Sequence, residues 1–464
     1  MNLWQLLALF QHELLLFAGV FFLIGAVDDL ATDFTWLWFR LTGKVKTQTV
    51  DRAQLQQAPL NGPMAVFIPA WNEDEVIGDT IAHALGAWPQ QELRLYVGCY
   101  RNDPATIAAA ARAANGDPRL RIVIHNCEGP STKADCLNRL YEAMRDDERR
   151  MGRLFAGVMF QDAEDMVDPG ALGLLDAAIA DGADFAQLPV EPLPQKHSRW
   201  IGSHYCEEFA EAHGKAMVVR DALGAALPGA GVGCAVARGA LQQLCRQRYD
   251  LRPFSAESLT EDYELGLGIA AIGGKSRFVR VRGEDGRLIA TRAYFPAQLD
   301  HVVRQKTRWV HGIALQGWDR VGWSSGLVET WMRARDRKGP LTALVLLIGY
   351  TLLALTLLSW LAIELGFGEP MALSQMLKAL LIANLIAFGW RAVWRFAFTA
   401  RNYGIAEGLR AVLRIPLTNV VAIMAGRRAI AAYTRTLMGR DVEWDKTPHS
   451  AHPARADLVE AQTA

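Results

Sequence analysis

The chain has 464 residues, which allows two or three domains. It carries 49 basic and 49 acidic residues, so its formal net charge is zero, and no basic excess indicates a nucleic-acid partner. Hydrophobic residues make up 51% of the chain, and the long apolar runs lie towards its two ends while most carboxylates lie between them. This distribution predicts a soluble domain between membrane segments. The six cysteines all fall in the central part without a CxxC pair, which excludes a zinc ribbon and fits a reducing cytosol.

Residues 1–46 are predicted to form an N-terminal membrane segment. The apolar residues 3–27 are long enough for one spanning helix, and a signal peptide is the alternative. The aromatic run 34–39 is typical of a membrane interface, and Arg40, Lys44 and Lys46 after it indicate that this side is cytoplasmic. Residues 47–62 are then expected to be a linker.

The central part, residues 63–325, shows strands alternating with helices. Apolar strand-like runs occupy residues 64–69, 93–98, 121–125 and 154–160, and helical patterns follow the first three at 74–88, 106–115 and 133–145. This alternation predicts a largely parallel sheet covered by helices on both faces. Further helices are expected at 197–219, 261–272 and 298–317, and a glycine-rich loop and strand at 228–237.

The fourth strand runs directly into the carboxylates Asp162, Glu164, Asp165 and Asp168. In open α/β sheets, ligands bind at the carboxyl edge of the strands. Asp162 and Glu164 are two residues apart, so they point to the same side if the strand geometry continues. Two accessible carboxylates suit a hard divalent cation such as Mg²⁺ or Mn²⁺. The alternative is an ordinary strand end followed by a solvated acidic turn.

Residues 326–449 are predicted to return the chain to the membrane. Residues 341–363 and 372–390 are long and apolar enough to span it, and the arginines before the first span and after the second place both ends on the cytoplasmic side. Residues 404–414 and 415–425 are too short or too charged to span, and we expect them to lie in the interface. The tail, 450–464, is expected to be disordered.

Six short motifs in chain order resemble those of family 2 glycosyltransferases, and together they extend from residue 64 to residue 449. They are Val66-Phe-Ile-Pro-Ala-Trp-Asn-Glu73, Lys133-Ala-Asp-Cys-Leu-Asn138, Phe160-Gln-Asp-Ala-Glu164 with Asp168-Pro169, Thr260-Glu-Asp262, Gln305-Lys-Thr-Arg-Trp309 and Trp444-Asp-Lys-Thr-Pro-His449. Within the family, Asn102-Asp-Pro-Ala-Thr106 and the D-A-E-D form resemble the inner-membrane phage-adsorption protein B subgroup.

The resemblance implies an α/β GT-A domain that transfers a sugar from a nucleotide-sugar donor, joined to transmembrane and interfacial helices. It assigns Asp262 as the catalytic base, and Asp162 and Glu164 as ligands of a divalent cation, Mg²⁺ or Mn²⁺. The implied donor-binding residues are Glu73, Asp103, Lys133 and Asp162, and the implied acceptor-binding residues are Gln305, Arg308 and Trp309.

The expected enzyme is an inverting, metal-dependent transferase in the bacterial inner membrane, with its catalytic domain in the cytoplasm. Its expected acceptor is a lipid-linked or polysaccharide glycan at the lipid surface, and an exporter is a further compatible partner. Two features depart from the family pattern: Glu164 replaces an aspartate, and Asp103 lies outside the usual D-D-G-S.

Three alternatives stay open at this point. Thr260-Glu-Asp262 is also a sequence for a helix N-cap with an acidic first turn. Trp309 suits an amphipathic helix that docks on a bilayer. The whole chain is also compatible with a non-catalytic membrane component of a surface-glycan or phage-receptor system, or with a nucleotidyltransferase.

Overall fold

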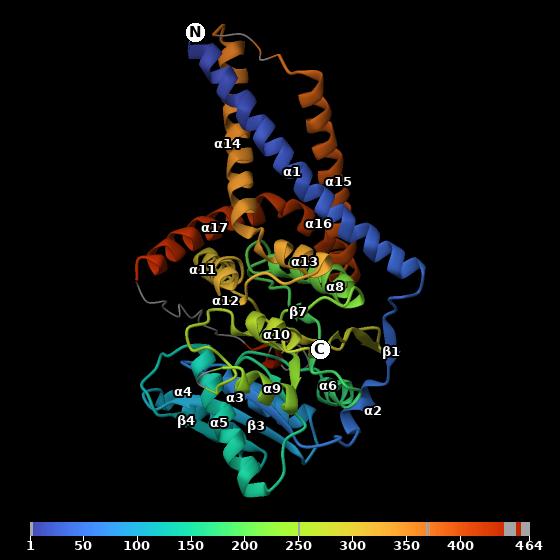
Figure 1. Ribbon diagram of the computed structural model, residues 1–464, viewed down its shortest axis with the longest axis vertical. Helices are drawn as coiled ribbons and strands as arrows, with labels where there is room; N and C mark the ends of the chain where they lie inside the picture. The colour runs from blue at the N-terminus through green and yellow to red at the C-terminus, as the bar shows by residue number, and fades with distance from the viewer. Residues whose placement is uncertain (1–2, 249–250, 368–369, 371, 440–451, 456–464) are drawn as a thin grey trace.

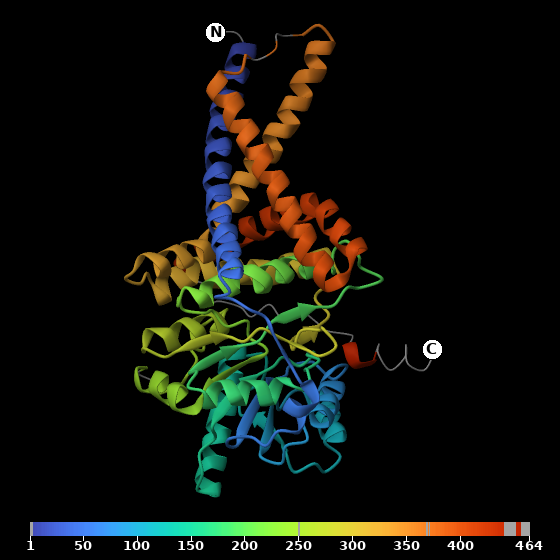
Figure 2. The ribbon, with the colours of Figure 1, turned by 90° about the vertical axis from the view of Figure 1, so that its right-hand side faces the viewer.

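The computed structural model describes residues 3–248, 251–367, 370, 372–439 and 452–455. The motif Trp444–His449 lies outside these residues. Figure 1 shows three long helices at one end, an α/β domain at the other, and shorter helices lying across the junction between them. The quarter turn of Figure 2 keeps the same three levels.

Seven strands form the central sheet in the order β4-β3-β2-β5-β8-β6-β9. Neighbours pair in parallel except for β8, which is antiparallel to both β5 and β6. The strands are β2 (Met64–Pro69), β3 (Leu93–Tyr100), β4 (Leu120–His125), β5 (Gly157–Phe160), β6 (Phe185–Gln187), β8 (Cys234–Ala237) and β9 (Ser276–Phe278). The predicted largely parallel sheet is confirmed, with one reversed strand.

Alternating side chains of the strands bury two hydrophobic cores, one on each face of the sheet. Val66 of β2 packs in the core that α3 (Ile77–Ala87), α4 (Pro104–Ala114) and α6 (Ala171–Ala180) cover. Phe67, one residue further, packs in the opposite core, beneath α5 (Lys133–Met151), α9 (Arg238–Arg246) and α10 (Glu261–Ala271). Helices therefore cover both faces, as the alternation of strands and helices predicts.

The N-terminal segment forms one helix rather than a span followed by a separate aromatic belt. Helix α1 runs from Leu3 to Leu41 without a break, so residues 34–39 continue the spanning helix. The expected linker 47–62 also contains structure. Strand β1 (Gln48–Val50) pairs in parallel with β10 (Val281–Gly283), and α2 (Arg52–Gln57) packs against α6.

In the part of the chain that the structure describes, three helices are long and apolar enough to cross a membrane: α1, α14 (Gly339–Glu364) and α15 (Gln375–Tyr403). Helices α16 (Ile405–Leu413) and α17 (Ile415–Leu437) meet at an angle of 53° and would be a fourth span only if they acted as one. In Figure 1 both lie across the base of the three long helices, which is the arrangement expected of interfacial helices.

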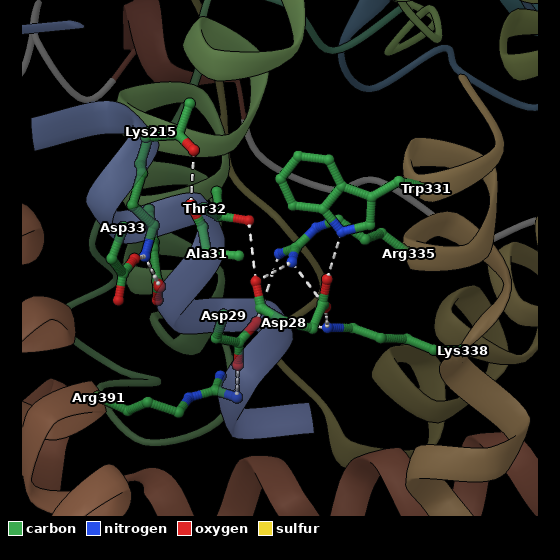
Figure 3. Close-up of polar contacts among 12 residues, drawn as sticks. Asp28, Asp29, Ala31, Thr32, Asp33, Lys215, Trp331, Arg335, Lys338 and Arg391 are labelled. Carbon is green, nitrogen blue, oxygen red and sulfur yellow. Dashed lines mark hydrogen bonds and ion pairs between the residues drawn. The ribbon is translucent and has the colours of Figure 1, made fainter. Parts of the chain in front are cut away.

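Carboxylates within residues 28–33 of α1 join the long helices to the α/β domain (Figure 3). Asp28 contacts Arg335 Nη1 at 2.6 Å and Lys338 Nζ at 2.8 Å, and Asp29 forms an ion pair with Arg391 of α15. Asp33 forms a buried ion pair with Lys215 of the α/β domain. The single helix α1 therefore connects the other long helices to the α/β domain.

The remaining elements lie between the sheet and the long helices. The predicted helix 197–219 is α7 (His204–Glu211), a π-helical turn η1 (Ala212–Ala216) and α8 (Met217–Ala222). The predicted helix 298–317 is α11 (Leu299–Trp309), a second π-helical segment η2 (Val310–Gln316) and α12 (Gly317–Val321), and α13 (Leu327–Arg337) follows. Strand β7 (Val190–Pro192) pairs with β11 (Thr291–Ala293). In the predicted tail, the ring of buried His452 lies 3.2 Å from the carbonyl oxygen of Asp165.

Candidate active site

A cleft opens at the carboxyl end of β5, below α16 and α17. These two helices lie across the base of the three long helices (Figure 1), and we call them the crosswise helices. Strand β5 ends at Phe160, so the acidic residues that follow leave the sheet at this edge. The cleft brings together residues that are far apart in the chain. Among its lining residues are Thr132, Lys133, Asp162, Glu164, Asp165, Ala230, Val232, Thr260, Glu261, Asp262, Phe295, Gln305, Arg308 and Trp309.

Lys133 lies at the centre of the charged groups. It opens α5, whose first turn is capped by Thr132, because the Thr132 hydroxyl accepts the backbone N–H of Asp135 at 3.1 Å. Its Nζ lies 2.5 Å from Asp162 Oδ1 and 3.6 Å from Glu261 Oε1. Burial alone would lower the pKa of Lys133, but the charges of Asp162, Glu261 and Asp262 outweigh it and raise the pKa. The amine is therefore a fixed positive charge at this edge.

The acidic loop after β5 carries two partly exposed carboxylates, Asp162 and Glu164, and two buried ones, Asp165 and Asp168. Asp165 is buried and accepts the backbone N–H of Asp162 at 2.7 Å, and burial, together with the charges of Asp162 and Glu164, raises its pKa. Asp168 is also buried and contacts Arg52 Nε at 3.1 Å and Arg292 Nη1 at 3.4 Å. Asp162 and Glu164 are left facing the cleft.

The donor set of this loop fits a hard cation that takes only part of its shell from the protein. Asp162 and Glu164 offer carboxylate oxygens, and the amine of Lys133 beside Asp162 shows that a positive charge is accommodated there. Within the described residues, three possible ligands converge only at His125, Cys127 and Asp135, not on the acidic loop. Phosphate oxygens and water would therefore complete the coordination of a cation at Asp162 and Glu164.

Asp262 enters the cleft from the first turn of α10. Thr260 is the N-cap residue of this helix and its first turn is acidic, as the N-cap alternative predicts, but the Thr260 side chain makes no capping hydrogen bond. Asp262 Oδ1 accepts the N–H of Tyr263 at 2.8 Å. Burial is the largest influence on Asp262 and raises its pKa, although Lys133 opposes it. Burial also raises the pKa of Glu261 to about 7, again against Lys133.

The glycine-rich loop 228–233 wraps around Asp262. The N–H of Gly229 donates to the backbone oxygen of Asp262 at 3.2 Å. Gly231 has a φ of +79°, and a Cβ on it would lie 2.8 Å from Asp262 Oδ2 and 3.4 Å from Lys133 Nζ. The backbone conformation therefore favours glycine here, and a Cβ would force the Asp262 carboxylate to shift.

Helix α11 supplies the opposite wall of the cleft. Gln305, Arg308 and Trp309 all line it, as the sequence predicts for neighbours on one helix. The Tyr205 hydroxyl of α7 donates to Gln305 Oε1 at 2.7 Å, and the Trp309 ring packs edge-on against Tyr205 with centroids 6.0 Å apart. Sequence reasoning missed Tyr205, because it lies 100 residues away and belongs to no motif.

Glu73 and Asp103 do not reach the cleft. Both follow neighbouring strands, β2 and β3, but the two oxygens of Asp103 accept the N–H groups of Asn72 at 2.7 Å and Thr106 at 3.2 Å. Asp103 therefore caps α4 and fixes the turn before Glu73. Both residues are buried, and neither lines the cleft. A contact to the donor stays a prediction for both residues, and each oxygen of Asp103 already accepts one backbone N–H.

Comparison with solved structures identifies the fold of the α/β domain. The mannosyltransferase PcManGT from Pyrobaculum calidifontis, solved with GDP-Man and Mn²⁺, superposes with a TM-score of 0.52 at 15% identity, over 88% of this chain and 99% of that one. The sheet, its helical layers and the cleft at its carboxyl edge thus form a GT-A fold, as predicted.

Sequence comparison then gives the family. A model described as "Glycosyltransferase like family 2" matches residues 61–312, and the chain belongs to this family. It is 32% identical over 456 residues to Bacteriophage adsorption protein B of Escherichia coli strain K12 and equally to Bacteriophage N4 adsorption protein B of E. coli O157:H7. The alignment covers 93% of this chain, which spans about 61% of the length of these relatives. The predicted subgroup resemblance is confirmed.

Proposed function

We propose that the protein transfers a sugar from a nucleotide-sugar donor to a lipid-linked or polysaccharide acceptor at the membrane, with inversion at the anomeric carbon. The observation that carries this proposal is the meeting of Lys133, Asp162 and Asp262 in one cleft beneath membrane-associated helices. The solved mannosyltransferase with GDP-Man and Mn²⁺ has the same fold, which supports a sugar nucleotide as donor and a divalent cation as cofactor.

The residues divide the chemistry between the two walls of the cleft. A cation at Asp162 and Glu164 would neutralise the charge that develops on the leaving diphosphate. Lys133 and Arg308 supply further positive charge to the same oxygens. Asp262 accepts the proton of the acceptor hydroxyl as that oxygen attacks the anomeric carbon. A single base on one side of the sugar gives direct displacement and hence inversion.

The surroundings of the cleft favour an acceptor at a lipid surface. Helix α11 carries Gln305, Arg308 and Trp309 and packs against the crosswise helix α17. Three large apolar side chains that follow α11 in the sequence are exposed: Trp318 by 52%, Trp323 by 43% and Leu327 by 91%. Exposed aromatic and aliphatic side chains next to spanning helices are typical of a membrane interface. We infer that the cleft lies on the cytoplasmic side of the inner membrane, because Arg335, Lys338 and Arg391, which flank the spans, pair with Asp28 and Asp29 where the long helices meet the α/β domain.

The deciding experiment compares donors and then removes the base. Purified protein with Mn²⁺ is screened for thermal stabilisation by UDP-, GDP- and TDP-sugars, and we expect one of them to raise the melting temperature. Asp262→Ala and Glu164→Ala should then abolish glycan output at normal protein level, with the donor still stabilising Asp262→Ala. Stabilisation by none of the donors would count against the enzyme.

The similarity to phage adsorption proteins motivates one alternative, a membrane component of a receptor system that does not turn over. Unchanged glycan output in both Asp262→Ala and Glu164→Ala would favour that alternative.

A further inference from the structure

A second hollow lies on the α/β domain, at the edge of the sheet opposite the cleft. It has a volume of about 410 Å³ and is formed by the end of α5, the segment that leads into β5, and α9. Helix α5 starts at Lys133 in the cleft and continues for 19 residues, about 28 Å at 1.5 Å per residue. Figure 1 shows the far end of α5 at the extremity of the molecule away from the long helices. The hollow is therefore separate from the donor and acceptor sites.

The hollow is strongly basic. Five arginines line it and Glu148 is its only carboxylate among the described residues: Arg145, Arg149, Arg153, Arg238 and Arg246. Glu148 is already committed, because it accepts Nε and Nη2 of Arg238 at 2.7 and 2.9 Å. Arg149 and Arg153 form ion pairs with the exposed carboxylates of Asp146 and Glu92, and such surface pairs are weak enough to exchange for a ligand.

Arg238 is the buried floor of this hollow. Its side chain is 5% exposed, and its third guanidinium nitrogen, Nη1, is buried without a hydrogen-bond partner among the described residues. A buried guanidinium N–H without an acceptor carries a free-energy penalty that an anionic ligand would remove. The guanidinium groups of Arg238 and Arg145 also lie 5.4 and 5.9 Å from the centre of the Tyr141 ring. The positive charges are thus held in place by packing.

The rim of the hollow adds an apolar surface. Leu154 and Leu251 line it and are each 60% exposed. A small inorganic anion would leave these two leucines in water, whereas a phosphate ester with an aromatic or aliphatic group would cover them. Arginine is the side chain that best matches phosphate oxygens, through paired hydrogen bonds.

We propose that this hollow binds a phosphorylated small molecule of nucleotide size, with its phosphates on Arg238, Arg149 and Arg246 and its apolar group on Leu154 and Leu251. The site is distinct from the one that binds the sugar donor, and its ligand is not consumed in the transfer.

The test is calorimetric titration of the full-length protein in detergent with ATP, GTP and inorganic tripolyphosphate. EDTA and an Asp162→Asn background suppress metal-dependent binding at the cleft. We expect ATP or GTP to bind at one site per chain, at least tenfold more tightly than tripolyphosphate. Arg246→Glu should weaken that binding at least tenfold. The matched control is Arg112→Glu, an equal charge reversal on an exposed position of α4 outside the hollow, and it should leave the affinity unchanged.

Three results would overturn the proposal. One is the absence of binding by both nucleotides at millimolar concentration. Another is tripolyphosphate binding as tightly as the nucleotides, which would show a general anion surface. The third is an equal loss in Arg246→Glu and Arg112→Glu, which would show an effect of net charge alone. Because Arg246 is exposed, the variant is expected to keep its fold, and an unchanged melting temperature checks this.

Discussion

At the scale of single residues, one amine organises the charges of the cleft. Lys133 contacts Asp162 from the β5 end and Glu261 from α10, two segments about 100 residues apart. Without it, the partly buried carboxylates of Asp162 and Asp262 and the buried carboxylate of Glu261 would repel one another. The same positive charge that compensates these carboxylates is available to the diphosphate of a bound donor.

Replacing Lys133 should therefore change the pH dependence of transfer. Burial raises the pKa of Asp262 and Lys133 lowers it. In Lys133→Gln the lowering influence disappears, so Asp262 becomes protonated at a higher pH and loses its function as a base. We expect the acid limb of kcat/KM to move upwards by about one pH unit. The measurement is the normalised pH profile of transfer by wild type and variant.

Lys275→Gln is the control for this profile, because Lys275 is an exposed lysine in the turn before β9 and does not line the cleft. An acid limb that stays in place in Lys133→Gln, or moves equally in both variants, would show that the amine does not set the ionisation of the base.

At the scale of elements, the glycine-rich loop is fitted to the base. Gly231→Ala should reduce transfer by about 100-fold, because the new Cβ would meet Asp262 Oδ2 at 2.8 Å and displace the carboxylate. Gly286→Ala is a matched control. Gly286 has nearly the same φ, +76°, but its Cβ would have no neighbour within 4 Å. Both variants pay a backbone cost of about 1–2 kcal/mol, so a difference in activity isolates the contact. Equal activities at equal melting temperatures would contradict this role of the loop.

A buried ion network fixes the crosswise helices to the α/β domain. Glu207 of α7 and Arg414 are both fully buried, and their side chains meet at 2.7 Å, while Arg395 of α15 reaches the same carboxylate at 3.0 Å. Burial is the largest influence on Glu207 and raises its pKa to about 7, although both arginines lower it. Removing one arginine leaves a buried carboxylate without its full compensation.

Arg414→Met should therefore destabilise the protein by about 3–5 kcal/mol. The sign of its pH dependence follows from Glu207. The loss of a cation raises the folded pKa of this carboxyl further above its unfolded value, so stability falls as pH rises between the two. The drop in melting temperature should be larger at pH 8.5 than at pH 6. The additional change Glu207→Gln should recover part of it. Arg428→Met, which removes an exposed pair with Asp300 at 3.3 Å, should cost less than about 1 kcal/mol.

The helices and strands of this fold were predictable where apolar residues recur with a clear helix or strand spacing. The first four strands, their helices and the meeting of Lys133, Asp162 and Asp262 followed from strand–helix alternation and from motif order. What escaped prediction depends on contacts between distant segments. No local pattern reveals that β8 is antiparallel or that the Tyr205 hydroxyl donates a hydrogen bond to Gln305. Nor does one reveal that both oxygens of Asp103 accept backbone N–H groups. The continuity of α1 also escaped, because the polar residues that interrupt its apolar run are compatible with a helix.

At the scale of the whole molecule, α1 connects membrane helices and catalytic domain. Asp33 is 1% exposed and lies about one turn further along α1 than Asp29 (Figure 3). It binds Lys215 of the α/β domain and accepts the indole N–H of Trp390 of α15 at 2.8 Å. The Asp33 carboxylate of α1 therefore contacts both α15 and the α/β domain. Lys215 also keeps a second partner, Glu211, at 2.7 Å.

Asp33→Ala should loosen this junction while the α/β domain stays folded, because Glu211 still compensates Lys215. The turn after α1, which contains Lys44 and Lys46, should then become accessible, and trypsin should cut there several-fold faster than in wild type. Glu13→Ala, which removes an exposed carboxylate from the same helix, is the matched control and should leave the rate unchanged. Donor-induced stabilisation should survive in Asp33→Ala. If both variants are cut at the wild-type rate, the packing of α1 against its neighbours, and not this carboxylate, holds the catalytic domain to the membrane helices.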